Sequence, residues 1–201
     1  LSDYDIIAHI SPDYIRSHRA AFAEASMIIV DGNLTPDTLE SVFKLARFYR
    51  VPVCADPTAM HLAPKLLGYL HELTMIAPNG AEAAVLCGLE TPPATTEEAI
   101  NMAHMLVSRG VSIAVVTLGE QGLAYADGSG AGHIPALRTQ VLDPTGVGDA
   151  MTGAVIFGLL NEMPVDEAMR LGISAASLTL RTTETVASDL SLDRIYDELV
   201  V

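Results

Sequence analysis

The sequence contains no tryptophan, and only 5% of its 201 residues are aromatic. Half of the residues are nevertheless hydrophobic, so aliphatic side chains and methionine have to fill a core of ordinary size. No apolar run reaches the roughly 18 residues that a membrane-spanning helix needs. The N-terminal residues also lack the basic and apolar regions of a secretory signal. We therefore expect a cytoplasmic protein with no membrane partner.

Basic residues and cysteines are scarce as well. Eleven Lys and Arg against 25 Asp and Glu give a net charge of −14. This balance argues against nucleic acid as a partner, because nonspecific binding depends on basic side chains that neutralise phosphates. A small phosphate-bearing ligand stays compatible with it, since backbone N–H groups at a helix start bind anions. Cys54 and Cys87 form no metal-type cluster and are typical of buried thiols in a reducing compartment.

Apolar runs alternate with helical patterns over the first part of the chain. Predicted strands cover residues 26–31, 51–56, 73–77 and 111–117, and the helices between them cover 35–50, 79–86 and 97–108. Strands separated by helices of this length indicate βαβ units and a mostly parallel sheet. Further on, Gly-rich turns within 119–142 predict antiparallel hairpins, and helices are predicted over 149–161, 165–180 and near 192–200. We predict one α/β domain over residues 1–201.

Polar residues follow four of the predicted strands at the point where each strand ends. They are Asp31, Asp56, Asn79 and Thr117, and we call them the strand-end residues. In open α/β sheets, ligands bind outside the carboxyl ends of the strands. The same residue types are also ordinary turn formers, so position alone leaves both interpretations open.

The segment from Asp143 to Asp149, with the sequence DPTGVGD, leads directly into a predicted helix. Its two glycines allow a tight turn whose N–H groups converge, and a helix N-terminus of this kind suits a phosphate oxyanion. Asp149 is placed where a carboxylate can take a proton from an attacking hydroxyl. The alternative is an ordinary glycine turn in which Asp149 only caps the helix. The segment is neither a Walker A loop nor a GxGxxG motif.

Two shorter motifs precede this segment. Asn79 is followed three residues later by Glu82, which by itself is also what a capping box looks like. Thr117, Gly119 and Gly122 form a Thr-x-Gly-x-x-Gly pattern at a strand end, which by itself is also an ordinary β-turn.

Taken together and in this order, the motifs resemble those of the ribokinase-like (PfkB) carbohydrate and nucleoside kinases. The resemblance implies a three-layer α/β/α fold. It also implies Asp149 as the general base, with the backbone of Gly146, Val147 and Gly148 as the anion hole and Thr145 beside it as a nucleotide contact. Two positions depart from the family pattern: Pro144 stands in place of Thr and Val147 in place of Ala.

The same resemblance assigns roles to the earlier motifs. Asn79 and Glu82 would help to hold Mg²⁺ and phosphate, with Asp56 of an Asp-Pro dipeptide near the metal. The turn formed by Thr117, Gly119 and Gly122 would lie along the phosphates of ATP. The segment 175–186, with Ala176, resembles the adenine pocket and is most similar to the pseudouridine kinases of the family. A monovalent cation such as K⁺ is a further candidate cofactor.

The resemblance extends over the whole chain but only over the later two-thirds of a family member. We expect the N-terminal part, with its Gly-Gly acceptor motif and lid, to be missing. Family members often dimerise through that lid, which leaves a homodimer and a monomer both open here. The expected activity is transfer of the ATP γ-phosphoryl group to a hydroxyl of a sugar or nucleoside, pseudouridine or ribose-like. The alternative is a nucleotide-binding remnant without kinase activity.

Overall fold

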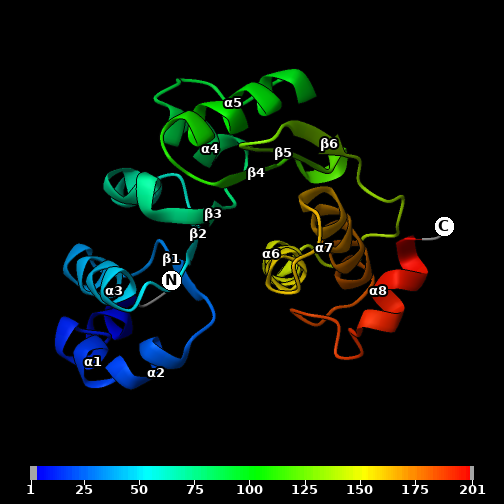
Figure 1. Ribbon diagram of the computed structural model, residues 1–201. Coiled ribbons are helices and arrows are strands. Elements are labelled where there is room, and N and C mark those ends of the chain that lie inside the picture. Colours follow the sequence, from blue (N-terminus) through cyan, green and yellow to red (C-terminus); the bar gives the residue numbers. More distant parts are fainter. Residues whose placement is uncertain (1–3, 200–201) are drawn as a thin grey trace. The chain divides into compact units, whose positions relative to one another are not determined.

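The computed structural model describes residues 4–199 (Figure 1). The chain divides into two compact units. The first unit runs to Thr117 and also holds Ala124–Ala131, and the second holds Leu118–Leu123 and the chain from Gly132 onward. The single domain predicted over residues 1–201 stays a prediction.

The sheet has six strands in the order β1-β2-β3-β4-β5-β6. Their bounds are β1 Ile28–Asp31, β2 Val53–Asp56, β3 Leu73–Ile76, β4 Ile113–Thr117, β5 Leu123–Asp127 and β6 Ala131–Ile134. Neighbouring strands from β1 to β4 pair in parallel, which confirms the predicted parallel sheet. The three residues between β5 and β6 leave room only for an antiparallel hairpin, as the glycine-rich turn predicted.

Helices lie before β1 and between the parallel strands of the first unit. They are α1 Pro12–Ser17, α2 Arg19–Glu24, α3 Pro36–Tyr49, α4 Gly80–Cys87 and α5 Thr96–Ser108, with 3₁₀ segments η1 Tyr4–His9 and η2 Ala63–Glu72. Helix α3 begins where the sequence predicts it, because the Thr35 side chain accepts the Thr38 N–H and Pro36 occupies the first turn. Its apolar face, including Leu39 and Phe43, is fully buried.

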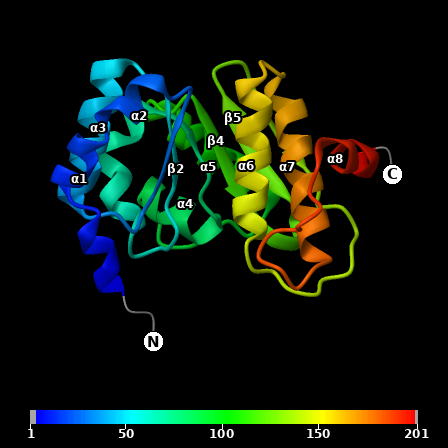
Figure 2. The same cartoon turned by 90° about the horizontal axis from the view of Figure 1, so that it is seen from below.

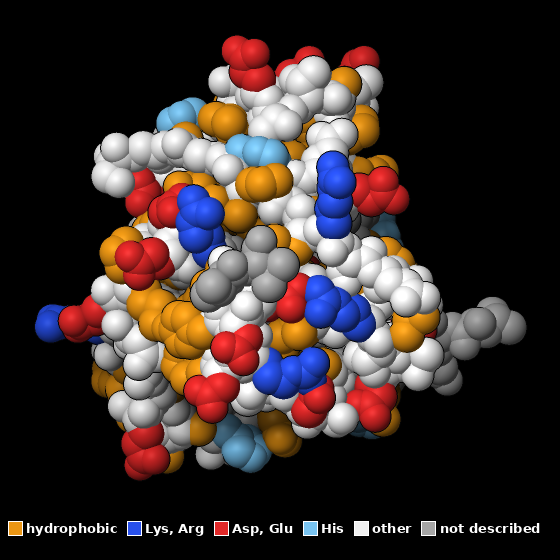
Figure 3. Space-filling view, turned by 90° about the vertical axis from the view of Figure 1, so that its right-hand side faces the viewer, with side chains coloured by type: hydrophobic (Ala, Val, Ile, Leu, Met, Phe, Trp, Pro, Cys, Tyr) orange, Lys and Arg blue, Asp and Glu red, His pale blue; other side chains and the backbone are white. Residues whose placement is uncertain are grey.

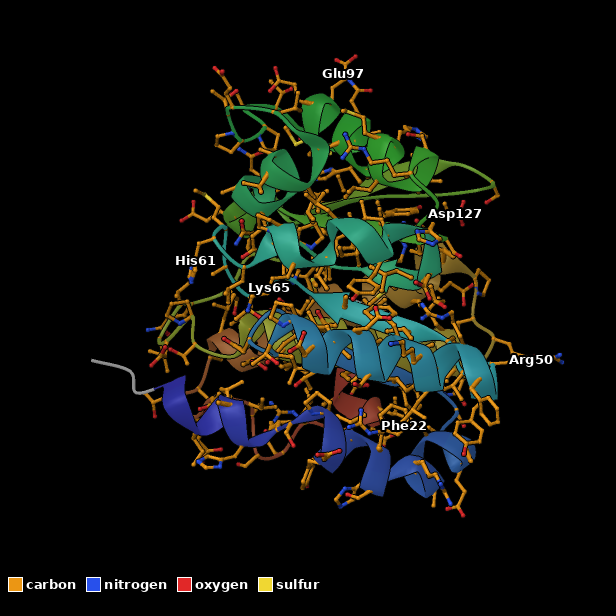
Figure 4. All side chains as sticks on the ribbon, turned by 90° about the vertical axis from the view of Figure 1, so that its left-hand side faces the viewer. Phe22, Arg50, His61, Lys65, Glu97 and Asp127 are labelled. Carbon is orange, nitrogen blue, oxygen red and sulfur yellow. The ribbon has the colours of Figure 1, made fainter. Side chains whose placement is uncertain are left out.

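The two N-terminal helices and η2 were not predicted. Figure 4 shows α1 and α2 beside α3, with Phe22 between α2 and α3. The Thr38 hydroxyl donates a hydrogen bond to the Ile10 carbonyl at 2.7 Å, and the Phe43 ring stacks on Tyr69 of η2 at 4.1 Å. These segments have six to ten residues each, too short for a clear period in the sequence, and contacts with α3 hold them in place.

The second unit contains the helices α6 Val147–Leu160, α7 Val165–Leu180 and α8 Leu192–Leu199. Helices α6 and α7 lie side by side in both ribbon views (Figures 1 and 2). Glycine allows this close approach, because a Cβ at Gly158 would lie 2.8 Å from the Ala168 Cβ. Helix α8 inserts Ile195 into an apolar cluster with residues such as Leu171 and Leu178 of α7.

The surface and the cysteines agree with the composition. On the face shown in Figure 3, Lys and Arg side chains are interspersed with Asp and Glu. Cys54 and Cys87 are both buried free thiols, as the sequence predicted, and burial raises the pKa of Cys54 to about 12. Within residues 4–199, no helix combines the length and apolar character that a membrane crossing requires.

The close packing of α6 against α7 leads to a stability prediction. Gly158→Ala places a methyl group against the Cβ and Cα of Ala168 and should lower the free energy of unfolding by about 1–3 kcal/mol. Gly153→Ala in the same helix meets no atom within 4 Å and should raise it by about 0.5–1 kcal/mol. Urea unfolding of both variants measures the difference, and equal midpoints would contradict the packing described.

Candidate functional site

The structure brings the strand-end residues of the first unit together in pairs. Asp31 and Asp56 are directly opposite each other in the β1–β2 register. Asn79 and Thr117 form an isolated parallel bridge, in which the Thr117 N–H donates to the Pro78 carbonyl at 2.9 Å. All four residues lie at the carboxyl ends of parallel strands, where the sequence placed them.

The turns that follow β1 and β2 are joined to each other. The Gly32 N–H donates to the Asp56 carbonyl at 2.9 Å, and a Cβ at Gly32 would lie 2.3 Å from the Pro57 carbonyl oxygen. Lys65, labelled in Figure 4, donates to the carbonyls of Gly32 and Leu34 at 2.9 and 3.1 Å. Sequence reasoning missed Lys65, because it lies more than 30 residues from the turn that it fixes and belongs to no motif.

Asn79 and Glu82 form the capping box that was the alternative interpretation of this motif. The Asn79 side chain accepts the N–H groups of Ala81 and Glu82, and Glu82 Oε2 accepts the Asn79 N–H at 2.9 Å. Glu82 is nevertheless unusual for a cap, because only 4% of it is exposed. Burial raises the pKa of Glu82, the Asn79 N–H partly offsets this rise, and the negative charge of Asp56 adds to it.

This pair of carboxylates fits the expected Mg²⁺ ligands. The effect of Asp56 on the pKa of Glu82 means that the two charges repel each other, and a bound cation would relieve that repulsion. Among residues 4–199, no group of three or more His, Cys, Asp or Glu is arranged to hold a metal ion. Mg²⁺ does not require such a group, since it usually keeps several waters and binds one or two carboxylates together with substrate phosphates.

In the second unit, the turn after β4 is closed by its own backbone. The Leu118 N–H donates to the Gly122 carbonyl at 2.8 Å, and the Gly122 N–H donates to the Gly119 carbonyl at 3.0 Å. Gly122 has a φ of 91°, and a Cβ there would lie 2.1 Å from the Ile134 carbonyl oxygen. Only glycine fits this position.

The start of α6 has an unusual geometry. Its N-cap is Gly146, with a φ of 78°, and a Cβ there would lie 1.7 Å from the Thr185 carbonyl oxygen. No side chain of the described residues caps this helix, which is also true of α2 and α7, whereas Thr35, Asn79 and Thr95 cap α3, α4 and α5. Asp149 is therefore not the cap, because it lies exposed in the first turn beyond Gly146. Of the first N–H groups of α6, that of Val147 donates to the Pro144 carbonyl at 3.4 Å, and those that follow it are available to an anion.

The residues before this helix are fixed by a small local turn. The Thr145 N–H donates to Asp143 Oδ1 at 2.8 Å. Hydrogen bonds from the hydroxyl and the N–H of Thr145 lower the pKa of Asp143. The backbone donor of Thr145, a predicted nucleotide contact, is therefore already used within the protein.

A cavity of about 540 Å³ lies within the second unit. Its lining residues are Gly119, Glu120, Ala136, Leu137, Arg138, Thr139, Val141, Pro144, Val147 and Leu180. The cavity thus joins two segments that the sequence singled out, the turn at Gly119 and the α6 start at Val147. Ala176, the predicted adenine contact, lies one helical turn before Leu180 on α7 and is not among the lining residues. The wall formed by residues 136–141 carries no motif, and sequence reasoning missed it.

Several solved structures have a similar fold. A sugar kinase from Clostridium perfringens matches 94% of the chain with a TM-score of 0.85 and 26% identity. A carbohydrate kinase from Agrobacterium tumefaciens matches 100% with a TM-score of 0.83 and 28% identity. The ribokinase of Arabidopsis thaliana, solved with ribose and ATP, gives a TM-score of 0.79 at 22% identity over 92% of the chain. The match covers 58%, 63% and 59% of the lengths of these three proteins. The likeness confirms the three-layer ribokinase-like α/β/α fold.

Comparison of sequences identifies the family of the chain. The pfkB family of carbohydrate kinases matches residues 6–191, and the chain belongs to this family. The pseudouridine kinase of Escherichia coli K12 is 27% identical over 196 residues, which are 97% of this chain and 61% of that protein. The guanosine-inosine kinase of Exiguobacterium acetylicum is 30% identical over 159 residues, 78% of this chain and 52% of that protein. The chain therefore spans about half of the length of one of these relatives and about three-fifths of the length of the other.

The raised pKa of Glu82 predicts a pH effect on stability. The folded protein binds the Glu82 proton more tightly than the unfolded chain, whose carboxyl has an ordinary value of 4.5. The contribution of Glu82 to stability should therefore decrease as pH rises above 4.5. Glu82→Gln keeps a hydrogen-bond acceptor for the cap and should remove this decrease, which makes the variant at least as stable as the wild type near neutral pH.

Urea unfolding from pH 4 to 8 measures the difference between the wild type and Glu82→Gln. The matched control is Glu97→Gln, because Glu97 also lies in the first turn of a helix and points into solvent (Figure 4). Parallel stability curves for the wild type and Glu82→Gln would show that the buried carboxylate has no such effect.

Proposed function

We propose that this chain is the nucleotide-binding and catalytic part of a kinase that transfers the γ-phosphoryl group of ATP to a hydroxyl of a sugar or nucleoside. The observation that carries the proposal is the start of α6. Its N–H groups have no side-chain cap, Asp149 lies in the same first turn, and Val147 lines the cavity of about 540 Å³. A phosphate bound at these N–H groups would have both a carboxylate and a nucleotide-sized cavity beside it.

The proposed mechanism uses backbone and side-chain groups in separate roles. Asp149 takes the proton of the acceptor hydroxyl as that oxygen attacks the γ-phosphorus and the bond to ADP breaks. The N–H groups of Gly146, Val147 and Gly148 stabilise the negative charge on the transferring phosphoryl oxygens. Typical losses on removal are about 10²–10⁴-fold for a general base and about 10²–10³-fold for one such donor.

The remaining predicted residues bind the nucleotide and its metal. Asp56 and Glu82 would hold Mg²⁺, with Asn79 fixing Glu82 from the cap. Bound Mg²⁺ neutralises phosphate charge when it is present. Thr117, Gly119 and Gly122 would follow the phosphates, together with Thr145. One solved structure of the same fold contains ATP and Mg²⁺, and another contains potassium. These structures support ATP, Mg²⁺ and K⁺ as cofactors in the proposal.

The names of the relatives support a class of acceptor. Pseudouridine kinase, guanosine-inosine kinase and ribokinase all take their names from ribose or a ribonucleoside. We therefore propose a ribose-containing acceptor, with pseudouridine as the first candidate. A cytoplasmic location and a homodimer belong to the same proposal.

A second function is nucleotide binding without transfer. The cavity of about 540 Å³ and the start of α6 would be enough to hold a nucleotide without an acceptor beside it. Titration with Mg·ATP, beside a coupled assay of ADP release over sugars and nucleosides, separates the two functions. Binding without ADP release from any acceptor would favour this second function.

The mechanism gives a direct prediction for Asp149. Asp149→Asn should reduce turnover by at least about 10²-fold, because the amide cannot take the hydroxyl proton, while the Kd for Mg·ATP should stay within about twofold. The control is Asp37→Asn, because Asp37 is likewise an exposed first-turn carboxylate, of α3, and should leave both values unchanged. Turnover of the Asp149 variant at the wild-type rate would refute the assignment.

A further inference from the structure

The segment 138–142 forms a thin wall between two cavities of the second unit. Arg138 and Thr139 line both the cavity of about 540 Å³ and a smaller one of about 280 Å³. Val141 lines the larger cavity, and Leu142 lines the smaller one. We call residues 138–142 the wall segment.

Apolar packing does little to hold the wall segment in place. Val141 is 58% exposed and Leu142 is 52% exposed, so neither side chain is anchored in a core. The segment also belongs to no helix or strand. Its position therefore depends on hydrogen bonds to the rest of the second unit. One is a backbone bond, in which the Leu142 N–H donates to the Leu180 carbonyl at 2.8 Å.

The second bond comes from the side chain of Arg181, which directly follows α7. Its Nε–H donates to Thr139 Oγ1 at 2.6 Å. Arg181 lines the smaller cavity and not the larger one, so it contacts the wall segment from the side away from the proposed nucleotide site. Figure 2 shows the loop that follows β6 and the loop that follows α7 at the same end of α6 and α7.

Two further residues, Ser177 and Glu198, hold the Arg181 guanidinium in place. It donates to Ser177 Oγ of α7 at 3.2 Å and pairs with Glu198 of α8. The Ser177 hydroxyl donates to the same Glu198 oxygen at 3.1 Å. Ser177 is 2% exposed and the Glu198 side chain 13%, so both partners of Arg181 are largely withdrawn from water. A planar guanidinium held on two sides presents its Nε–H in a fixed direction.

We propose that Arg181 is a positioning residue for the nucleotide: it holds Thr139, and through Thr139 it holds the wall segment in the place where the segment closes one side of the larger cavity. Glu198 orients Arg181, so helix α8 contributes to nucleotide affinity without touching the nucleotide. The inference rests on the proposed function, because it takes the larger cavity as the ATP site. Apolar Leu137, Val141 and Leu180 on this side of the cavity suit the nucleotide base rather than the phosphates.

The test compares Arg181→Met with Arg194→Met. Arg194 is the matched control, because its side chain is 43% exposed against 41% for Arg181, and it too pairs with a carboxylate near α8, that of Asp189. In the complete chain, Arg181→Met should raise the Kd for Mg·ATP about tenfold, as expected for loss of a hydrogen bond from a charged donor. Arg194→Met should leave the Kd within about twofold.

Two further variants separate positioning from general stability. Thr139→Val removes the acceptor oxygen but keeps the shape, and the double variant with Arg181→Met should bind Mg·ATP no more weakly than Arg181→Met alone. Thr139→Ser keeps the hydroxyl and should bind like the wild type. If Arg181→Met only lowers the unfolding midpoint and leaves the Kd unchanged, Arg181 is a structural residue and the proposal is overturned.

Hydrogen exchange supplies a readout that needs no nucleotide. Amides of residues 138–142 should exchange at least about fivefold faster in Arg181→Met than in the wild type or Arg194→Met. Unchanged exchange would overturn the positioning role even if ATP binds. Failure of the wild type to bind Mg·ATP would overturn the proposed function as well as this inference. Faster exchange with an unchanged Kd would overturn only the inference.

Discussion

The close contact between Gly146 and the Thr185 carbonyl is the constraint on which the proposed site depends. It leaves no space for a side chain at the N-cap, and the φ of 78° is one that other residues rarely adopt. The usual N-cap, a Ser, Thr, Asn or Asp in an extended conformation, is therefore excluded at this position. A helix that begins in this way leaves its first donors to a ligand, and the loop containing Thr185 becomes part of the same structure.

The structural role of Glu82 is compatible with the metal-binding role that we propose for the same side chain. One of its oxygens completes the capping box of α4, which by itself would explain the residue. A cap, however, is normally exposed, and burial of Glu82 beside Asp56 makes its ionised form less stable. A cation bound near Glu82 would favour its ionised form.

The parts that sequence predicted correctly are those with local causes. Helix α3 has Thr35 at its N-cap, Pro36 in its first turn and a regular apolar face, and the parallel strands have continuous apolar runs. The glycine pattern likewise indicated the turn before Asp149. Lys65 and Arg181 could not be found in this way, because their partners lie about 30 and 42 residues away and no spacing rule connects them. The wall segment has no regular hydrophobic pattern from which its conformation could be predicted.

The difference between parts fixed by local sequence and parts fixed by distant contacts also applies to the proposed kinase site. The phosphates of the proposed nucleotide would contact mainly backbone N–H groups and glycine turns, which a short motif can specify. The proposed place of the base is lined instead by side chains of an irregular loop, which distant contacts such as that between Arg181 and Thr139 hold in position. A motif is therefore enough to propose chemistry at the phosphate, whereas in our proposal the affinity for the rest of the nucleotide would depend on how firmly α7 and α8 hold that loop.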